Sequence, residues 1–559
     1  MTSPRVKRLL PLAAVAIWLA ACGGGDSTAD AEPAGTTAGS VTLDLAPYSA
    51  EEQQRVNALQ AQAGSSEPRY IVTLNPAAVA EAMPRSRAIL STGQLAASRQ
   101  QVAVQQVAQR LLAGRGARVL GHYSQALQGF AATVPEAQAE RFVAELADHP
   151  AVLAIERDRP VQAGALRQAA AADGRWGLDR IDQARLPLDG WFTNTRDGSG
   201  VTVYVVDSGI SAHGEFGARL LAGHDTIGDG TGTADCTGHG SHVAGIAAGA
   251  TVGVAPGAQL VPVRVIGCGG SGWGSSLIQG LDWIATHGVR PGVVNLSLGS
   301  SASAATDQAV ARLTSAGFTV VASAGNDNAD ACRYSPARAA SALTVGATDV
   351  RDTRAVFSNF GSCLDLFAPG TNIASASHAD AAALVTKQGT SMATPFVAGA
   401  AALVLQERPK LTAAQVGTQL TTQAIASAVK SSGAGSKNKL LFVGPARQVV
   451  FPTPWDVHVE SLGVATRKSG RSAWVATVTV AVHQEEGQPL KGVKVSARFS
   501  NNNALRSCVT AANGTCTLSS STLRLDLASV TLAVSDLSGT ALTYRPADNL
   551  LSAVTATRP

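Results

Sequence analysis

The sequence predicts an α/β fold class: a doubly wound parallel-sheet domain at the centre, a small α+β module before it and an antiparallel β-sandwich after it. Between residues 176 and 443, short β-branched runs alternate with Ala-rich helical segments, the pattern of a parallel sheet covered on both faces. Strands and helices also alternate over residues 69–161, and beyond residue 444 apolar residues recur with period two. The chain is therefore expected to hold three folded parts.

The composition narrows the class of protein. The chain has 559 residues, of which 45% are hydrophobic and 15% charged, with 44 Lys and Arg against 40 Asp and Glu. This nearly balanced charge excludes a disordered acidic or basic tail protein and argues against nucleic acid as the main partner. The 7 cysteines are an odd number. In an exported protein one of them is then a free thiol, an intermolecular bridge or a modified residue.

The N-terminus has the pattern of an export signal. Basic residues precede an uncharged apolar run over 9–19, which is too short to span a bilayer and suits a signal-peptide core. The run ends in Leu-Ala-Ala-Cys22. This ending resembles a bacterial lipoprotein signal, so residues 1–21 are expected to be removed and Cys22 to carry lipid that holds the precursor at the outer membrane or cell surface. The alternative is an ordinary signal peptide with an incidental cysteine.

Residues 22–67 are rich in Ala, Gly, Ser and Thr and are expected to be a flexible tether, with or without a short helix at its end. Residues 68–165 form the α+β module. Its expected strands are 70–74, 130–134 and 152–156, and its expected helices are 84–112 and 135–146. An Ala-rich stretch over 163–172 indicates an exposed, cleavable linker.

Residues 170–445 form the α/β domain, with continuous apolar strands expected at 201–206, 259–265, 293–297, 319–323 and 342–345. In such folds the active site lies at the carboxyl ends of the strands. Residues 453–559 form the β-sandwich, with alternating strands at 474–482 and 493–499. The sandwich carries no acid, base or metal constellation, and substrate attachment, cell-surface docking and stabilisation remain open as its role.

Three short segments carry the carboxylate, imidazole and hydroxyl groups that nucleophilic catalysis uses. Asp207 ends a predicted buried strand, and His239 and Ser391 each begin a predicted helix. A serine hydroxyl is a poor nucleophile at neutral pH unless an imidazole takes its proton. Asp207 would hold His239 in the useful tautomer, and His239 would act first as base and then as acid.

Two other interpretations of these residues fail on the sequence. His239 and His242 could imitate a metal pair, but no third ligand is evident. The residues around Ser391 lack the second glycine of the esterase motif, and the chain order Asp, His, Ser differs from that of the α/β-hydrolases. A catalytic metal and an esterase fold are therefore not expected.

The order Asp207, His239, Ser391 and its flanking residues resemble the subtilisin-like serine proteases, or subtilases. The likeness extends over residues 176–443 and is strongest to the aqualysin-like enzymes of the proteinase K branch, through the motifs WGLDRIDQ, DCTGHG, AGNDN and LFAPG. The resemblance implies a serine endopeptidase that hydrolyses proteins with broad specificity through an acyl-enzyme. It also implies that the side-chain amide of Asn326 is the second oxyanion donor.

The same resemblance implies where a polypeptide substrate binds. An extended peptide would add to edge strands near Gly272 and near Leu298 and Gly299, where main-chain hydrogen bonds give affinity with little sequence demand. Ala324 and Gly325, together with Leu298 and Gly299, would line the first specificity pocket. These segments bring no charge to its wall, so an apolar or aromatic preference is expected.

Calcium is implied as a structural ion. A first site, matching one in the aqualysin-like branch, would use the oxygen ligands of Asp179, Asp182, Gln183 and Asp189, although Trp191 stands where that site prefers a short polar residue. Asp365 matches a second site of the proteinase K branch. The alternative for both is a solvated acidic surface.

The cysteines beyond Cys22 are expected to form three disulfides. The resemblance implies Cys236–Cys268 and Cys332–Cys363. Cys508 and Cys516 flank an Asn-Gly turn and are expected to pair across that hairpin. Free thiols would need a reducing compartment, against which the export signal argues.

Residues 68–165 resemble the inhibitor propeptide of this superfamily, which covers the catalytic sheet and lays its C-terminal strand through the cleft. The chain is then expected to be a monomeric, self-processing zymogen with its own propeptide as inhibitor and polypeptides as substrates. Processing would separate the mature enzyme from the lipid on Cys22 and release it outside the cell. The alternatives are a separate interaction domain at 68–165 and a catalytically inactive surface-binding protein, against which the complete set of site residues argues.

Overall fold

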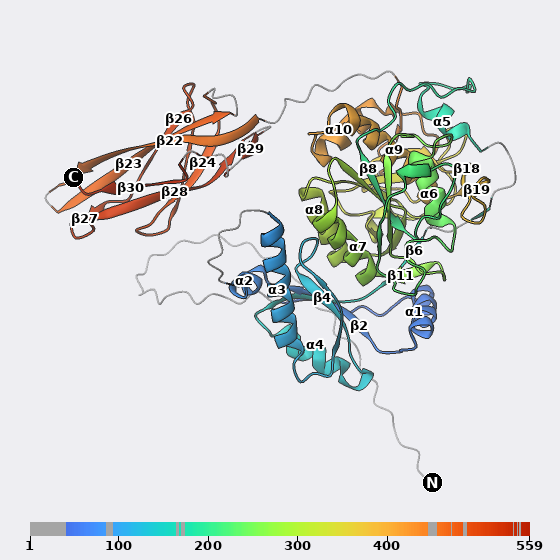
Figure 1. Ribbon diagram of the computed structural model, residues 1–559, viewed down its shortest axis with the longest axis horizontal. Helices are drawn as coiled ribbons and strands as arrows, with labels where there is room; N and C mark the ends of the chain where they lie inside the picture. The colour runs from blue at the N-terminus through green and yellow to red at the C-terminus, as the bar shows by residue number, and fades with distance from the viewer. Residues whose placement is uncertain are drawn as a thin grey trace, which may run out of the picture.

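The computed structural model describes residues 41–84, 93–163, 167–168, 174–444, 455–470, 472–484, 489–539, 542–544, 546, 549 and 551–559. An α+β module, a large α/β domain and a β-sandwich follow one another along the chain (Figure 1). The predicted signal peptide and Cys22 lie outside the described residues. Within these residues no helix is long and apolar enough to cross a membrane.

A nine-stranded sheet forms the centre of the α/β domain, in the order β20-β21-β17-β16-β14-β12-β8-β10-β9. All neighbouring pairs from β9 to β21 are parallel. The strands are β8 (Thr202–Asp207), β9 (His224–Asp225), β10 (Gln259–Arg264), β12 (Gly292–Leu296), β14 (Thr319–Ser323), β16 (Leu343–Thr348), β17 (Leu366–Pro369), β20 (Ile425–Ala426) and β21 (Lys439–Leu440). The predicted doubly wound parallel sheet is confirmed.

Helices cover both faces of this sheet, and this explains the continuous apolar runs of the strands. Val203 and Val205 of β8 enter a core with helices α6 and α9, whereas Tyr204 and Val206 enter a second core with α7 and α8. The helices are α5 (Trp176–Ile181), α6 (His239–Ala248), α7 (Gly274–His287), α8 (Ala304–Ser315), α9 (Thr390–Glu407) and α10 (Ala413–Gln423).

The α+β module is a five-stranded sheet in the order β1-β5-β2-β4-β3. Its elements are β1 (Thr42–Asp44), β2 (Arg69–Leu74), α2 (Pro76–Glu81), α3 (Gly93–Leu112), β3 (Arg118–Tyr123), β4 (Gly129–Thr133), α4 (Ala139–Ala147) and β5 (Val152–Arg157). Helices α3 and α4 cover one face of the sheet. The other face packs against α7 and α8, since Ile71, Tyr123 and Ala131 share the core of those helices (Figure 1). Strand β3 and helix α2 were not predicted.

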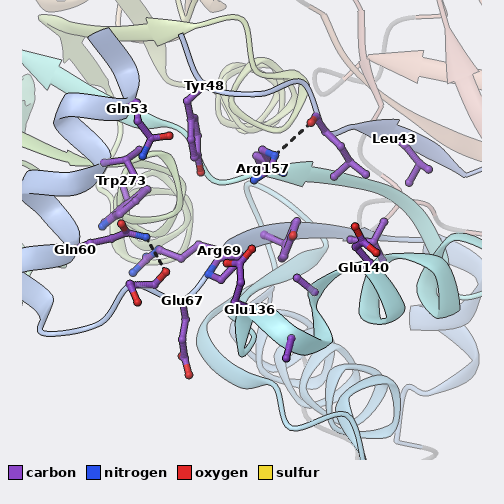
Figure 2. Close-up of a pocket in the computed structure, with 18 of the residues that line it drawn as sticks. Leu43, Tyr48, Gln53, Gln60, Glu67, Arg69, Glu136, Glu140, Arg157 and Trp273 are labelled. Atoms are coloured by element: carbon purple, nitrogen blue, oxygen red, sulfur yellow. Dashed lines mark hydrogen bonds between the residues drawn. The ribbon is translucent and has the colours of Figure 1, made fainter. Parts of the chain in front are cut away.

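Residues 41–67, the end of the predicted tether, contain a strand that was not predicted and a helix that was left open as an alternative. Strand β1 pairs in parallel with β5, and helix α1 (Ala50–Ala63) begins at a capping box of Ser49 and Glu52. Its two buried apolar side chains, Val56 and Leu59, pack against Trp273 of the α/β domain. The apolar pattern of α1 is weak, because only two of its apolar side chains are buried. Their partner in the α/β domain lies more than two hundred positions away in the sequence. Figure 2 shows the pocket that α1 and Trp273 line together with the α+β module.

Two short ladders hold the chain that leaves the α+β module. Strand β6 (Pro160–Ala163) lies between β11 (Ser271–Trp273) and β13 (Leu298–Ser301), and β13 also pairs with β15 (Tyr334–Ser335). Strand β7 (Arg167–Gln168) pairs with β19 (Leu384–Gln388), which pairs with β18 (Ile373–Ala376). The described part of the predicted linker is therefore bound along the α/β domain.

The C-terminal part is a two-sheet sandwich whose core contains Trp474 and Phe499. One sheet holds β22 (Trp455–Lys468), β23 (Ala473–Gln484), β26 (Thr515–Ser519), β27 (Leu523–Arg524) and β29 (Leu542–Tyr544); the other holds β24 (Lys494–Phe499), β25 (Leu505–Val509), β28 (Ser529–Ser538) and β30 (Ala553–Thr557). All pairs except β22–β29 are antiparallel. Cys508 and Cys516 are bonded, but β25 and β26 belong to different sheets, so the bridge joins the two sheets and does not cross a hairpin.

Candidate active site

Asp207 and His239 meet at the carboxyl end of the central sheet. Asp207 is the last residue of β8 and His239 the first of α6. The imidazole Nδ1 lies 2.7 Å from Asp207 Oδ1, and both side chains are fully buried. Gly238 caps α6 with a φ of 74°, a conformation that favours glycine, and a side chain there would collide with His378.

Ser391 is the second residue of α9, and this helix packs beside α6. Its hydroxyl donates to the Ser297 carbonyl oxygen at 3.0 Å. The second imidazole nitrogen, His239 Nε2, is buried and has no hydrogen-bond partner. Asp207 and His239 are therefore in direct contact, while the Ser391 hydroxyl is held by a backbone carbonyl.

Asn326 lies in the loop after β14. Its side-chain oxygen accepts hydrogen bonds from the backbone N–H of Thr390 at 2.8 Å and from the Thr390 hydroxyl at 3.0 Å. Since the amide oxygen is occupied by two donors, the amide nitrogen is the group left to donate. Asn326 and the N-terminus of α9 can thus both offer N–H groups beside Ser391.

The carboxylate of Asp235 joins the two elements that carry Asp207 and His239. It accepts the Ser208 hydroxyl at 2.9 Å, the Gly238 N–H at 2.8 Å and the Ser241 N–H at 2.8 Å. Asp235 is part of a motif quoted from the sequence, but its role depends on contacts that only the fold creates. Ser297 could not have been found in this way, because it acts through a backbone carbonyl that any residue supplies.

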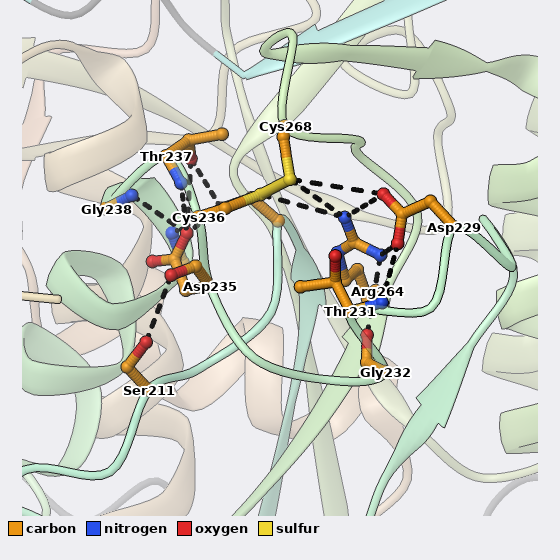
Figure 3. The surroundings of a disulfide bond; sticks show 12 residues. Ser211, Asp229, Thr231, Gly232, Asp235, Cys236, Thr237, Gly238, Arg264 and Cys268 are labelled. Carbon is orange, nitrogen blue, oxygen red and sulfur yellow. Dashed lines mark hydrogen bonds and ion pairs between the residues drawn. A yellow bond between two sulfur atoms is a disulfide. The ribbon is translucent and has the colours of Figure 1, made fainter. Parts of the chain in front are cut away.

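A disulfide between Cys236 and Cys268 follows directly after Asp235 (Figure 3). The Arg264 guanidinium lies 3.7 Å and 3.5 Å from the two sulfur atoms and pairs with Asp229 at 2.7 Å. A second disulfide joins Cys332 and Cys363. The first bridge ties down the segment that carries Asp235, and the second joins the loop after β14 to the segment just before β17.

The residues predicted to bind substrate line a groove that the chain's own strand β6 occupies. Gly272 pairs with Val161, Gly299 with Gln162 and Leu298 with Ala163. A cavity of about 550 Å³ is bounded by Leu298, Gly299, Ala324, Gly325 and Asn326. Asp327, Arg333 and three charged residues of α1 also line it. The charges come from α1, Asp327 and Arg333 and not from the segments for which an uncharged wall was predicted.

Asp179, Asp182 and Gln183 fit a cation site. Each leaves one buried side-chain oxygen without a hydrogen-bond partner: Asp179 Oδ1, Asp182 Oδ1 and Gln183 Oε1. Burial, followed by the nearby carboxylates of Asp179 and Asp189, raises the pKa of Asp182. In the described part of the chain no three His, Cys, Asp or Glu side chains are arranged as a metal site, so a cation here would need the Gln183 oxygen as well.

The other two candidates for calcium binding, Asp189 and Asp365, have different surroundings. Asp189 accepts the Trp191 N–H at 2.9 Å, and the Trp191 side chain is 75% exposed, which leaves the cluster clear of the indole. Asp365 does not fit a second site, because Lys437 pairs with its Oδ1 at 2.7 Å and the Thr344 N–H donates to its Oδ2 at 3.0 Å.

Comparisons with known proteins agree with this geometry. The Subtilase family model matches residues 198–486, and the Peptidase inhibitor I9 model matches residues 69–163. An extracellular serine proteinase of Thermus sp. (strain Rt41A) is 49% identical over 376 residues, which cover 67% of this chain and 89% of that protein. Alkaline serine exoprotease A of Vibrio alginolyticus is 44% identical over 323 residues, which cover 57% of this chain and 59% of that protein.

A solved structure, the crystal structure of a cold adapted subtilisin-like serine proteinase, is 48% identical, covers 48% of this chain and 98% of its own, and has a TM-score of 0.47. The family matches and the two relatives confirm the resemblance inferred from the motifs. The chain belongs to the subtilase family and is an exported serine endopeptidase made as a zymogen with its own inhibitory propeptide.

Proposed function

We propose that Asp207, His239 and Ser391 form the catalytic triad and that Asn326 stabilises the oxyanion. The observation that carries this proposal is the buried contact of 2.7 Å between His239 Nδ1 and Asp207 Oδ1, which leaves the buried Nε2 free to accept a proton. Ser391 begins the helix packed beside that of His239.

Acylation follows from these positions. The Ser391 hydroxyl leaves the Ser297 carbonyl, turns toward His239 and gives its proton to Nε2 as Oγ attacks the peptide carbonyl carbon. Asp207 accepts the Nδ1–H throughout and stabilises the imidazolium. The tetrahedral oxyanion accepts hydrogen bonds from the Ser391 backbone N–H and the Asn326 amide nitrogen.

The intermediate then collapses to products. The C–N bond breaks, His239 Nε2–H protonates the leaving amine, and the acyl group stays on Ser391 Oγ. Water attacks the ester next: His239 takes a proton from the water and returns it to Ser391 Oγ as the carboxylic acid product leaves. The net reaction is hydrolysis of one peptide bond.

Substrates are extended polypeptides taken with broad specificity. The pairing of β6 with Gly272, Leu298 and Gly299 supports this, because it displays the main-chain hydrogen bonds that an added strand would make. Such bonds involve no particular side chain. The enzyme also cuts its own chain between the strands β6 and β7, and this separates the propeptide from the mature domain.

Calcium binds at Asp179, Asp182, Gln183 and Asp189 as a structural ion. The three orphaned buried oxygens support this proposal, since a hard divalent cation prefers such ligands. When bound, the ion neutralises the carboxylates and holds the segment that begins the α/β domain. It takes no part in the chemical steps.

Cys22 carries the lipid that holds the precursor at the membrane, and the mature enzyme leaves this anchor as a monomer. The sequence before and at Cys22 supports the proposal. Because Cys22 precedes the propeptide, one cleavage after the propeptide breaks the covalent link of the enzyme to both inhibitor and anchor. Lipid found on active protein of mature size would overturn this coupling.

The test of the catalytic proposal compares the full chain with Ser391→Ala on casein. The parent should hydrolyse casein and lose its N-terminal module, whereas the variant should do neither and stay at precursor size. Asp207→Asn should retain a small residual rate, about 10⁴-fold below the parent. Equal cleavage of casein by parent and Ser391→Ala would overturn the assignment.

A further inference from the structure

We propose that residues 41–64, which precede the part of the chain matched by the inhibitor family, are a second inhibitory segment. This segment binds the α/β domain on a surface made of Trp273, Ser301 and Gly269, beside the groove that β6 occupies. The inference rests on the zymogen organisation described above and names a further contact that must open before the enzyme is active.

The first contact is apolar. Val56 and Leu59 of α1 pack on Trp273, and the three side chains are only 2%, 8% and 7% exposed. Trp273 ends β11, one of the two strands that hold β6, and the Arg69 guanidinium covers its ring at 4.4 Å (Figure 2). Separation of α1 would therefore expose an aromatic side chain at the rim of the groove.

The second contact is polar and lies at the other strand of the groove. Ser301 ends β13, and its hydroxyl donates to the carboxylate of Glu52, the residue that also caps α1. Arg159 lies 3.5 Å from the same Glu52 carboxylate and 3.4 Å from that of Asp44. Glu52 and Arg159 are only 7% and 8% exposed, so the centre of this network is buried, while Asp44 lies at its exposed edge. Acidic residues of the segment thus meet a hydroxyl of the domain and a cation of the propeptide.

The third observation concerns the far end of α1. A side chain on Gly269 would collide with the Gln62 amide, so α1 runs close over the loop that follows the disulfide cysteine Cys268. From Ser301 to Gly269 the helix spans both edge strands of the groove. A segment that touched only the propeptide would not need this length.

The segment is also fastened to the strand that enters the groove. The Tyr48 hydroxyl donates to the Asp158 carbonyl at 2.9 Å, and Arg157 Nε donates to the Leu45 carbonyl at 3.2 Å (Figure 2). Arg157 ends β5, and only Asp158 and Arg159 separate it from β6. Because α1 and β6 are linked, each holds the other at a high effective concentration on the domain, and the cleaved propeptide should leave only when both contacts open.

The experiment uses the full chain with Leu59→Asp, and Ala58→Asp as the matched control. Ala58 is exposed on the same helix, so the control adds the same charge without touching Trp273. Loss of the precursor band and appearance of peptidase activity are followed separately, and the time between these two events is the delay that is compared. We expect cleavage at the parent rate in both variants, and activity appearing at least about tenfold sooner after cleavage in Leu59→Asp alone. Equal delays in Leu59→Asp and the parent, or equal acceleration in both variants, would overturn the inference.

A second variant decides the matter if Leu59→Asp yields no mature protein. Glu52→Gln keeps the side-chain shape but removes the negative charge that accepts the Ser301 hydroxyl of the α/β domain, and it should shorten the delay by a smaller factor. An unchanged delay in Glu52→Gln would then overturn the inference. The mature forms of all variants should have equal kcat/KM, because the segment is absent from them. A parent chain that neither cleaves itself nor hydrolyses peptides would instead contradict the catalytic assignment.

Discussion

The carboxylate of Asp235 accepts the hydroxyl of Ser208 at 2.9 Å, which fixes the residue after Asp207 against the start of the helix that bears His239. The Ser208 hydroxyl in turn accepts the Gly240 N–H at 3.0 Å. Asp207 and His239 are thus held by two elements that share one buried acceptor. The geometry of this pair depends on a third side chain, that of Asp235.

Replacement of Asp235 by Asn should lower kcat by about 100-fold with little change in KM, because an amide nitrogen would face backbone N–H donors and displace His239. Ser211→Ala is the matched control, since the Ser211 hydroxyl bonds only the backbone carbonyl of Asp235 at 3.0 Å. Steady-state kinetics on a peptide substrate decide the result. A variant that loses affinity but keeps kcat would contradict the positioning role.

Asn326→Ala should reduce kcat by about 100- to 1000-fold, because one oxyanion donor is lost while the strands that pair with an extended peptide are unchanged. KM should stay within a few-fold of the parent value. Single-turnover measurements should place the loss in acylation. A variant that acylates at the parent rate would exclude Asn326 from the oxyanion hole.

Two carboxyl groups, the buried one of Glu156 and the partly exposed one of Asp282, lie at the contact between the propeptide and the α/β domain. Glu156 accepts the Ser303 hydroxyl at 2.6 Å at the start of α8, and Asp282 of α7 accepts backbone N–H groups at Gln125 and Ala126. Burial is the main cause that raises the pKa of Glu156 above 4.5 and that of Asp282 above 3.8. Both groups bind their protons more tightly in the complex than in the separated parts.

The contact should therefore weaken as the pH rises. Its contribution from these groups is complete below their ordinary pKa values and is lost as the pH increases through the raised ones. The measurement uses the Ser391→Ala precursor as the parent and follows its thermal unfolding midpoint as the pH is raised. From about pH 4 upward, this midpoint should fall more steeply than that of the same chain with Glu156→Gln. Glu136→Gln changes an exposed carboxyl of the same module and should follow the parent. Parallel curves for Glu156→Gln and the parent would contradict this linkage.

The sequence was sufficient for the elements whose signals are local. Strand β14 lies where its apolar run predicted it, at Thr319–Ser323, and each strand face finds a helix to cover it. Short motifs singled out Asp207, His239 and Ser391 as candidates, and the structure brings Asp207 and His239 into contact. The Ser49–Glu52 capping box was also visible in the sequence and could have predicted the start of α1.

Other features depended on partners that the sequence does not place. Asp365 offers the oxygens of a calcium ligand, but Lys437 occupies one of them from 72 positions away. The bridge of Cys508 and Cys516 has the spacing of a hairpin, yet their strands turn into different sheets. In each case the residue type was informative and the neighbour in space decided its role.

Removal of calcium should destabilise the protein through the Asp182 cluster. A chelator should lower the thermal midpoint of the parent by on the order of 5–10 °C, the effect of a ligand present at about 100 times its Kd. Asp182→Asn should abolish the difference between chelated and calcium-loaded protein. Asp365→Asn is the matched control and should preserve the difference, because that carboxylate is paired with Lys437. If the chelator left the thermal unfolding midpoint of the parent unchanged, the calcium proposal would be wrong.

The position of self-processing is bracketed by two strand pairings. Ala163 pairs with Leu298, the neighbour of Ser297, whose carbonyl accepts the Ser391 hydroxyl. On the other side Arg167 pairs with Gln388, three positions before Ser391. The peptide bond that is cut is therefore expected to lie after Ala163 and before Gln168. N-terminal sequencing should show that the mature protein begins within residues 164–168. The Ser391→Ala chain should give no such terminus, unless active enzyme is added. A first mature N-terminus beyond residue 168 would show that the register of β6 and β7 is not that of the cleaved chain.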